Sequence, residues 1–311
     1  MKSIIIAILG LLLLAAPAAV HAQYTYTTNA DNTLTITGYT GAGGVVIIPA
    51  ATNGLTVTII GNGTSPVFGS SVTNVTIPDG VTTIAEYAFE DCYNMTNVTI
   101  PDSVTSIGDY AFEDCEQLAG ITIPNGVTSI GYETFEECTN LGNLTFPDSV
   151  TSIEDYAFEY CYGLKNVTIG PNVTSIGEYA FYDCGISNLT IGNNDTITNG
   201  GCAIGEEAFY ECYSMQNVMI GSSVTSIGEY AFGDCSMTNL TIGANITSPG
   251  LGCAIGYEAF YDCRGLEQRH DRQQRHQHRL RGVLRLQHDQ PHDRRQRPKP
   301  QRGLLHRVRG V

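Results

Sequence analysis

A strict internal repeat runs along most of this chain, and it constrains the fold more than any other feature. Residues 97–115, NVTIPDSVTSIGDYAFEDC, return with small changes, and Cys92, Cys115, Cys138, Cys161 and Cys184 follow one another with a constant period of 23. Each copy carries a phenylalanine three positions before a cysteine: Phe89 and Cys92, Phe112 and Cys115, Phe135 and Cys138, Phe158 and Cys161, Phe181 and Cys184, Phe209 and Cys212, Phe232 and Cys235, and Phe260 and Cys263. The intervals from Cys184 to Cys212 and from Cys235 to Cys263 are longer by the same amount, because each holds an insertion of the same kind, NNDTITNGGCAIG or ANITSPGLGCAIG. Eight copies in phase predict a solenoid, in which each unit packs mainly on its neighbours.

One copy has a readable layout. Val98 and Ile100 alternate with polar residues, which predicts a short strand. Pro101 lacks an amide donor and ends that strand. The residues around Phe112 predict one short helical turn that ends near Cys115. Since a single coil cannot bury its apolar side chains alone, we expect stacked coils that are mainly β, with one short helical turn in each.

Residues 1–22 have the pattern of a signal peptide. A positive start at Lys2 and an apolar run over residues 4–16 precede the small-residue cleavage site Val20-His21-Ala22. The run of about 13 residues is shorter than the roughly 20 that span a bilayer. Gln23 follows, where a lipid anchor would need a cysteine. We expect cleavage after Ala22; the alternative is an uncleaved membrane anchor.

The next segments predict how the solenoid begins. Residues 23–54 alternate in polarity and contain a turn at 29–32, which indicates an N-terminal β-hairpin cap. Residues 55–265 then give about nine coils, the first of which is degenerate, with Phe68 in place but no cysteine. A cap is expected here because an open solenoid end exposes unpaired strands and apolar side chains.

The succession of a strand, Ile-Pro, VTSIG and YAFxxC resembles the BspA-type leucine-rich repeat of secreted and surface proteins from bacteria and some protists. The resemblance covers roughly residues 55–265. It implies a curved leucine-rich-repeat solenoid and roles in adhesion to host or matrix proteins. It implies no fixed set of binding residues.

The net charge of −15 hides two opposite regions. Residues 23–265 hold 27 acids against Lys165 and Arg264, whereas residues 266–311 hold 13 Lys and Arg against four acids. Read one base later, codons for residues 267–272 permit Ser-Asn-Val-Thr-Ile-Gly, the strand of the repeat. The shifted codons at Val283 and Leu286, one repeat length after Phe260 and Cys263, permit Phe and Cys. We interpret 266–311 as a frameshifted repeat that is disordered; the alternative is a genuine basic tail.

Residue types missing from residues 23–265 argue against catalysis. This body has no histidine, so it lacks a Ser-His-Asp or Cys-His arrangement. Two cations are too few to hold a nucleic-acid backbone. We therefore expect no enzyme activity, no cofactor and no nucleic-acid partner. A hydrolase that uses two carboxylates stays open, although paired acids recur at one repeat position, whereas an active-site pair would be unique.

Those recurrent acids predict a solvated column along the stack. Its members are Glu90, Asp91, Glu113, Asp114, Glu136 and Glu137. Like charges about 5 Å apart repel, and a hard cation such as Ca²⁺ would relieve the repulsion. The alternative is screening by ordinary salt.

The cysteines permit two interpretations. Export favours disulfides, but parallel Cβ vectors on adjacent coils disfavour a bridge, so we expect reduced and buried thiols in the ladder. Cys202 and Cys253 lie in the insertions and are candidates for free or intermolecular thiols.

Outward positions of the predicted strand form an uncharged strip. Its members are Asn97, Thr99, Asn143, Thr145, Asn166, Thr168, Asn188 and Thr190. This strip is either a recognition face or a means of keeping the sheet soluble.

These features predict a secreted or cell-surface scaffold for binding or adhesion, with an extracellular protein or glycan as partner and no transmembrane segment in the mature chain. The alternative is a structural surface-layer protein, stabilised by Ca²⁺ through its acidic columns. Because recurrent residues are scaffold, specificity should lie where copies differ: the insertions, the cap and the C-terminal end.

Overall fold

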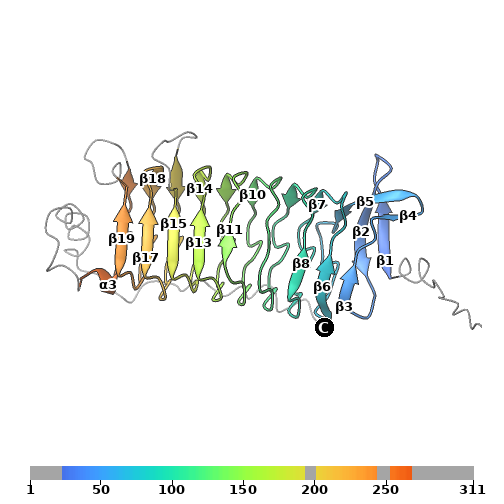
Figure 1. Cartoon of the computed structure of the whole chain (residues 1–311), viewed down its shortest axis with the longest axis horizontal. Helices are drawn as coiled ribbons and strands as arrows, with labels where there is room; N and C mark the ends of the chain where they lie inside the picture. The colour runs from blue at the N-terminus through green and yellow to red at the C-terminus, as the bar shows by residue number, and fades with distance from the viewer. Residues whose placement is uncertain (1–22, 193–200, 244–252, 268–311) are drawn as a thin grey trace, which may run out of the picture.

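The chain forms an elongated solenoid whose coils follow one another from β1 to α3 (Figure 1). This computed structural model describes residues 23–192, 201–243 and 253–267. The predicted signal peptide, most of both insertions and nearly all of the tail lie outside the described residues. The repeat fold built from parallel strands agrees with the predicted fold class.

Short strands, one coil apart, pair into four sheets. The first sheet contains β1 (Tyr24–Thr28), β2 (Leu34–Tyr39), β4 (Ala51–Thr52), β5 (Leu55–Ile60), β7 (Thr83–Ile84) and β9 (Ser106–Ile107). A second contains β3 (Gly44–Ile47), β6 (Val72–Thr76) and β8 (Asn97–Thr99). A third contains β10 (Ser129–Ile130), β12 (Ser152–Ile153), β14 (Ser175–Ile176), β16 (Cys202–Ile204), β18 (Val224–Ile227) and β20 (Ala254–Ile255). The fourth contains β11 (Leu144–Thr145), β13 (Asn166–Ile169), β15 (Asn188–Ile191), β17 (Asn217–Ile220) and β19 (Asn239–Ile242).

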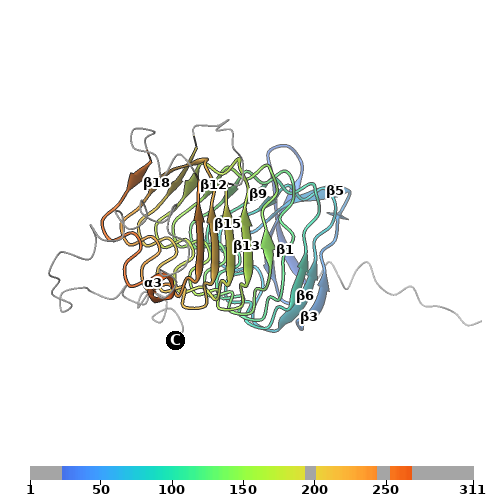
Figure 2. The ribbon, with the colours of Figure 1, turned by 60° about the vertical axis from the view of Figure 1, so that its left-hand side comes forward.

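Most coils contribute one strand of the NVTI type and one of the VTSI type, so two columns of strands run along the stack (Figure 2). Equivalent positions pair in register, as Asn166 does with Asn188 and Ile169 with Ile191. The NVTI column is interrupted between β8 and β11, where Gly120 stands in place of the strand asparagine and residues 118–123 form no strand. Glycine weakens a strand, because it loses more backbone entropy on ordering and offers no side chain to pack.

A continuous phenylalanine ladder fills the core. Seven of the eight repeat phenylalanines are fully buried, and Phe260, in the last coil, is 3% exposed. Adjacent rings stack with centroids 4.8–5.4 Å apart, starting from Phe68 in the degenerate first coil. Such offset-stacked pairs contribute about 0.5–1.5 kcal/mol each beyond the burial of their area.

The segment around each phenylalanine is a run of tight turns, which corrects the expected helical turn. In one coil the amides of Ala111 and Glu113 donate to carbonyls three residues earlier, while those of Tyr110, Phe112 and Asp114 donate to the next coil. Tyr110 and Asp114 have positive φ angles of 58° and 56°. A residue in the left-handed region cannot continue a right-handed helix, so the chain here alternates between bonding to itself and to its neighbour.

The N-terminal end is closed by an antiparallel hairpin of β1 and β2. Its turn at residues 29–32 contains Asn32, with φ of 62°. β2 then pairs in parallel with β5, and β3 in parallel with β6. The hairpin therefore occupies residues 24–39 of the 23–54 expected, because β3 already belongs to the first coil. At the opposite end, α3 (Arg264–Glu267) follows the last ladder cysteine (Figure 1).

Candidate binding surfaces

The expected Asn–Thr strip lies on the outer face of the NVTI strands. Its side chains are exposed except Thr190, which is half-buried. The members divide between two sheets, because β8 carries Asn97 and Thr99, while the coils of β11, β13 and β15 carry the other six. Only the second group forms an uninterrupted surface of adjacent strands.

Asparagine side chains on this surface form a hydrogen-bonded ladder. Each Nδ2 donates to the Oδ1 of the preceding rung: Asn166 to Asn143 at 2.7 Å, Asn188 to Asn166 at 2.7 Å, Asn217 to Asn188 at 2.7 Å and Asn239 to Asn217 at 2.6 Å. An amide group has two donors and two acceptor lone pairs, so each inner rung keeps half of its capacity for a ligand. The ladder therefore fixes the orientation of these side-chain amides before any ligand binds.

One residue of this strip departs from the repeat and was missed by sequence reasoning. Met219 occupies the threonine position between Thr190 and Thr241 and is 40% exposed. A methionine is flexible and polarizable, and it adapts to irregular apolar partners. The substitution of Met for Thr in an otherwise regular column was the signal that pointed to it.

The six acids expected in a solvated column lie on the turns. Asp91 is exposed, and Glu90, Asp114, Glu136 and Glu137 are half-buried. Glu113 is 8% exposed and Glu159, one coil beyond Glu136, is 4% exposed, so full solvation was wrong for this column. In the packed stack Glu113 and Glu159 are therefore buried, while Asp91 stays in solvent.

Three carboxylates converge at the centre of this turn region. One oxygen from each of Glu113, Glu133 and Glu136 lies within 4.8 Å of the other two. Burial, followed by repulsion from Glu133 and Glu90, raises the pKa of Glu113 to about 9. The pKa of Glu136 is raised by burial and by the charge of Glu133, with which its carboxyl shares a hydrogen bond. Glu133 was not among the predicted acids.

The ladder cysteines are free thiols that bond to the backbone of the preceding coil. Cys115 donates to the carbonyl of Phe89 at 3.3 Å, and Cys138 to that of Phe112 at 3.2 Å. The same contact recurs at 3.0–3.2 Å through the five following ladder cysteines. Sequence reasoning treated this position as a small apolar group and did not find the donor role.

The two insertion cysteines differ from each other. Cys202 is 1% exposed, because it begins β16 and pairs with Val224, so it occupies the valine position of the VTSI strand. Burial makes it unsuitable for the intermolecular bond that its insertion suggested. Cys253 is half-buried and retains an accessible thiol.

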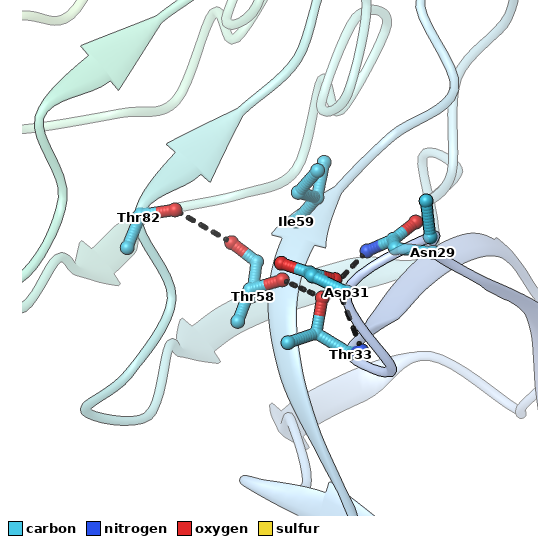
Figure 3. Close-up of a pocket in the computed structure, with 7 residues that line it drawn as sticks. Asn29, Asp31, Thr33, Thr58, Ile59 and Thr82 are labelled. Carbon is cyan, nitrogen blue, oxygen red and sulfur yellow. Dashed lines mark hydrogen bonds between the residues drawn. The ribbon is translucent and has the colours of Figure 1, made fainter.

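A shallow depression of about 490 Å³ lies between the cap and the first coils (Figure 3). Its hydroxyls are connected: Thr58 donates to Thr33 at 2.8 Å, and Thr33 donates to Asp31 at 2.7 Å. Hydrogen bonds from the side-chain and backbone donors of Thr33 lower the pKa of Asp31. These groups bond mainly to one another, and the bond from Thr58 to Thr33 joins the cap to the first coil.

Comparison with known proteins decides the family. The model of the BspA type leucine rich repeat region matches residues 65–190 and 134–267, with six copies. The chain belongs to the BspA-type leucine-rich repeat family. The resemblance inferred from the repeat is thereby confirmed.

Two solved structures of leucine-rich repeat proteins are similar to this BspA-type protein. A leucine-rich repeat protein from T. pallidum is 27% identical, with a TM-score of 0.57, over 62% of this chain and 88% of that chain. A leucine-rich cell surface protein from Faecalibacterium prausnitzii is 29% identical over 78% of this chain and 86% of that chain, with a TM-score of 0.46. No curated protein matches the chain significantly. Among the described residues, none belongs to a helix with the length and hydropathy needed to cross a bilayer.

Proposed function

We propose that this BspA-type protein is a secreted or cell-surface binding scaffold that recognises an extracellular protein or glycan through the strip on β11, β13, β15, β17 and β19. The observation that carries the proposal is the asparagine ladder, with its four hydrogen bonds of 2.6–2.7 Å along an exposed face. Ordering a side chain on binding costs about 0.5–1.5 kcal/mol. Amides already held in place avoid most of that cost.

The chemistry of the strip suits a polar ligand with regular spacing. Amide and hydroxyl groups repeat at the strand separation of about 4.8 Å, and each can donate and accept. Met219 adds an exposed apolar contact in the middle of the strip. The strip itself is uncharged, although the body around it is strongly acidic. These properties favour an extended chain, either a glycan or a polypeptide segment, laid along the stack.

Export and the absence of catalysis are parts of the same proposal. The export signal expected in residues 1–22 supports an extracellular location. The body has no histidine, and its buried acids occupy two recurring repeat positions. A binding role needs neither a catalytic group nor a cofactor.

The test is a binding screen with a strip variant. The purified full chain is applied to a glycan array and to a panel of extracellular matrix proteins, and ligands that bind are titrated. Thr168→Arg, in the exposed centre of β13, should reduce affinity at least tenfold, because a charged side chain covers two rungs of the ladder. The melting temperature (Tm) should stay within about 2 °C of the unmodified chain, since exposed substitutions change stability little.

A matched substitution outside the strip is Thr128→Arg, also at an exposed threonine, next to β10. It should leave affinity unchanged. Equal losses in the two variants would place recognition elsewhere, and no ligand in either panel would count against the scaffold proposal itself.

A further inference from the structure

We propose that Glu113, Glu133 and Glu136 form a binding site for one Ca²⁺ ion on the turn face of the solenoid. The site goes beyond the proposed binding function and does not depend on it. It also differs from a continuous acidic column, since it consists of three residues in two adjacent coils.

The geometry fits one hard cation. One oxygen of each carboxylate lies within 4.8 Å of the other two, which is the separation that oxygens reach on opposite sides of a single Ca²⁺. Ca²⁺ binds oxygen ligands at about 2.3–2.6 Å and accepts irregular arrangements of six to eight of them. Three side chains leave positions for water, as Ca²⁺ sites commonly do.

An unpaired oxygen points to a ligand independently of the clustering. Glu113 is 8% exposed, and its Oε2 is buried with no hydrogen-bond partner. A buried polar atom without a partner costs about 1–3 kcal/mol, and a charged one costs more. Every charged group that shifts the pKa of Glu113 is another acid. A divalent cation would supply the missing partner and cancel this repulsion.

The site depends on a glutamate that replaces the tyrosine found in most copies of the repeat. Two residues before the phenylalanine, most copies have tyrosine, as at Tyr110 and Tyr156, but the third full copy has Glu133. Tyr132, one residue earlier, provides the aromatic ring in this coil. Its ring centroid lies 5.4 Å from that of Tyr110 and 5.5 Å from that of Tyr156. Glu133 therefore takes no part in the tyrosine column and lies beside Glu113 and Glu136.

Two further copies provide an internal comparison. Glu207 and Glu258 occupy the same repeat position as Glu133 and are buried. The positions that hold Glu113 and Glu136 around Glu133 are Tyr182 and Tyr210 around Glu207. These tyrosines place no further carboxylate beside Glu207, and their hydroxyls donate to other acids, Tyr182 to Glu211 and Tyr210 to Asp234. Among the residues that the structure describes, three carboxylates converge around Glu133 and not around Glu207, which makes Glu207 a matched control.

The experiment measures Ca²⁺ itself on the full chain. After treatment with a chelator, CaCl₂ is titrated in a calorimeter at pH 7.5, and Tm is followed in parallel. We expect one site, with a Kd on the order of 10⁻⁴ to 10⁻³ M, as in extracellular Ca²⁺ modules. At ten times Kd, Tm should rise by about 3–6 °C.

Neutral variants locate the site. Glu133→Gln and, separately, Glu136→Gln should weaken Ca²⁺ binding at least tenfold and abolish the Tm rise. Two variants are used because, if one of them misfolds, the other still tests the Ca²⁺ site. Both should keep a Tm close to that of the chelated chain, because a glutamine amide can donate to a neighbouring carboxylate as a protonated carboxyl does. Glu207→Gln should keep the full response to Ca²⁺.

Three results would overturn the proposal: no heat and no Tm rise in the unmodified chain at 10 mM CaCl₂, an undiminished response in both site variants, or an equal loss in Glu207→Gln. A response to MgCl₂ as large as that to CaCl₂ would overturn the assignment of Ca²⁺. None of these measurements involves a binding partner, so they stand apart from the test of the scaffold.

Discussion

At the scale of single residues, cysteine combines two properties that this coil requires. It fills a small apolar space beside the stacked phenylalanines, and its thiol donates to a carbonyl of the preceding coil, as from Cys184 to Phe158 at 3.0 Å. Alanine would lack the donor, and serine would bring a more strongly hydrated group into the core. The recurrence of cysteine in eight copies follows from this contact and needs no disulfide.

Thiol chemistry tests that interpretation. Burial raises the pKa of Cys92 to about 12 and that of Cys138 well above its usual value, so neither forms a thiolate near pH 8. We expect Cys253, which is half-buried, to react with a thiol reagent in the folded chain, while the eight ladder cysteines and Cys202 react at least a hundredfold more slowly. Quantifying modified residues by mass spectrometry gives the measurement.

Full unfolding in denaturant serves as the control, since all ten thiols should then react at similar rates. Rapid modification of Cys138 in the folded chain would contradict the buried donor role.

At the scale of elements, the NVTI strands are joined by side chains as well as by backbone. An inner rung such as Asn188 takes part in two ladder bonds, whereas the end rung Asn143 takes part in one. A hydrogen bond between uncharged groups contributes about 0.5–1.5 kcal/mol, with exposed ones at the low end. The contribution of each rung should therefore depend on its place in the sheet.

Alanine substitution distinguishes these rungs. Asn188→Ala should lower the unfolding free energy by about 1–2 kcal/mol and Asn143→Ala by roughly half of that, both measured by denaturant unfolding. Thr168→Ala, on the same face, is the comparison for loss of strand propensity alone. Equal effects at Asn143 and Asn188 would mean that the ladder adds nothing to the sheet.

At the scale of the whole molecule, stacking repeats concentrates acids of one sign on the turn face. Burial and mutual repulsion raise the pKa of Glu113 to about 9 and that of Asp114 to about 7. The pKa of Glu159 is also raised, first by burial and then by the charge of Glu133. In a solenoid this electrostatic repulsion is distributed along the stack, because each coil contacts only its neighbours.

Stability without divalent cations should depend on pH accordingly. A carboxyl whose pKa is higher in the folded chain than in the unfolded chain binds more protons when folded. Its contribution is complete below the unfolded pKa of about 4.3 and is lost as pH rises toward the folded value. In chelator, Tm should therefore be about 5 °C or more higher at pH 5 than at pH 8. A flat profile, or one that rises with pH over this range, would contradict the buried acidic face.

Several elements of the fold could be predicted from the repeat. Spacing alone indicated which residues stack, so the strand at Asn166–Ile169 and the phenylalanine and cysteine ladders followed from it. The turns could not be predicted, because Tyr110 and Asp114 adopt left-handed conformations that favour glycine and that no local pattern indicated. The candidate surfaces were predicted in part: the Asn–Thr strip was located, but its side-chain bonds and Met219 were not recognised.

The sequence by itself determined the period, the family and the residues that form each ladder, because a strict repeat places equivalent positions above one another whatever the details of the coil. Only the tertiary structure decided which non-equivalent repeat positions come into contact between neighbouring coils. Glu133 precedes its phenylalanine and Glu113 follows the phenylalanine of the preceding coil, and they converge because tight turns fold both positions toward the same face. The burial of Glu113 likewise depends on how closely neighbouring turns approach, and that distance is a property of the packed stack.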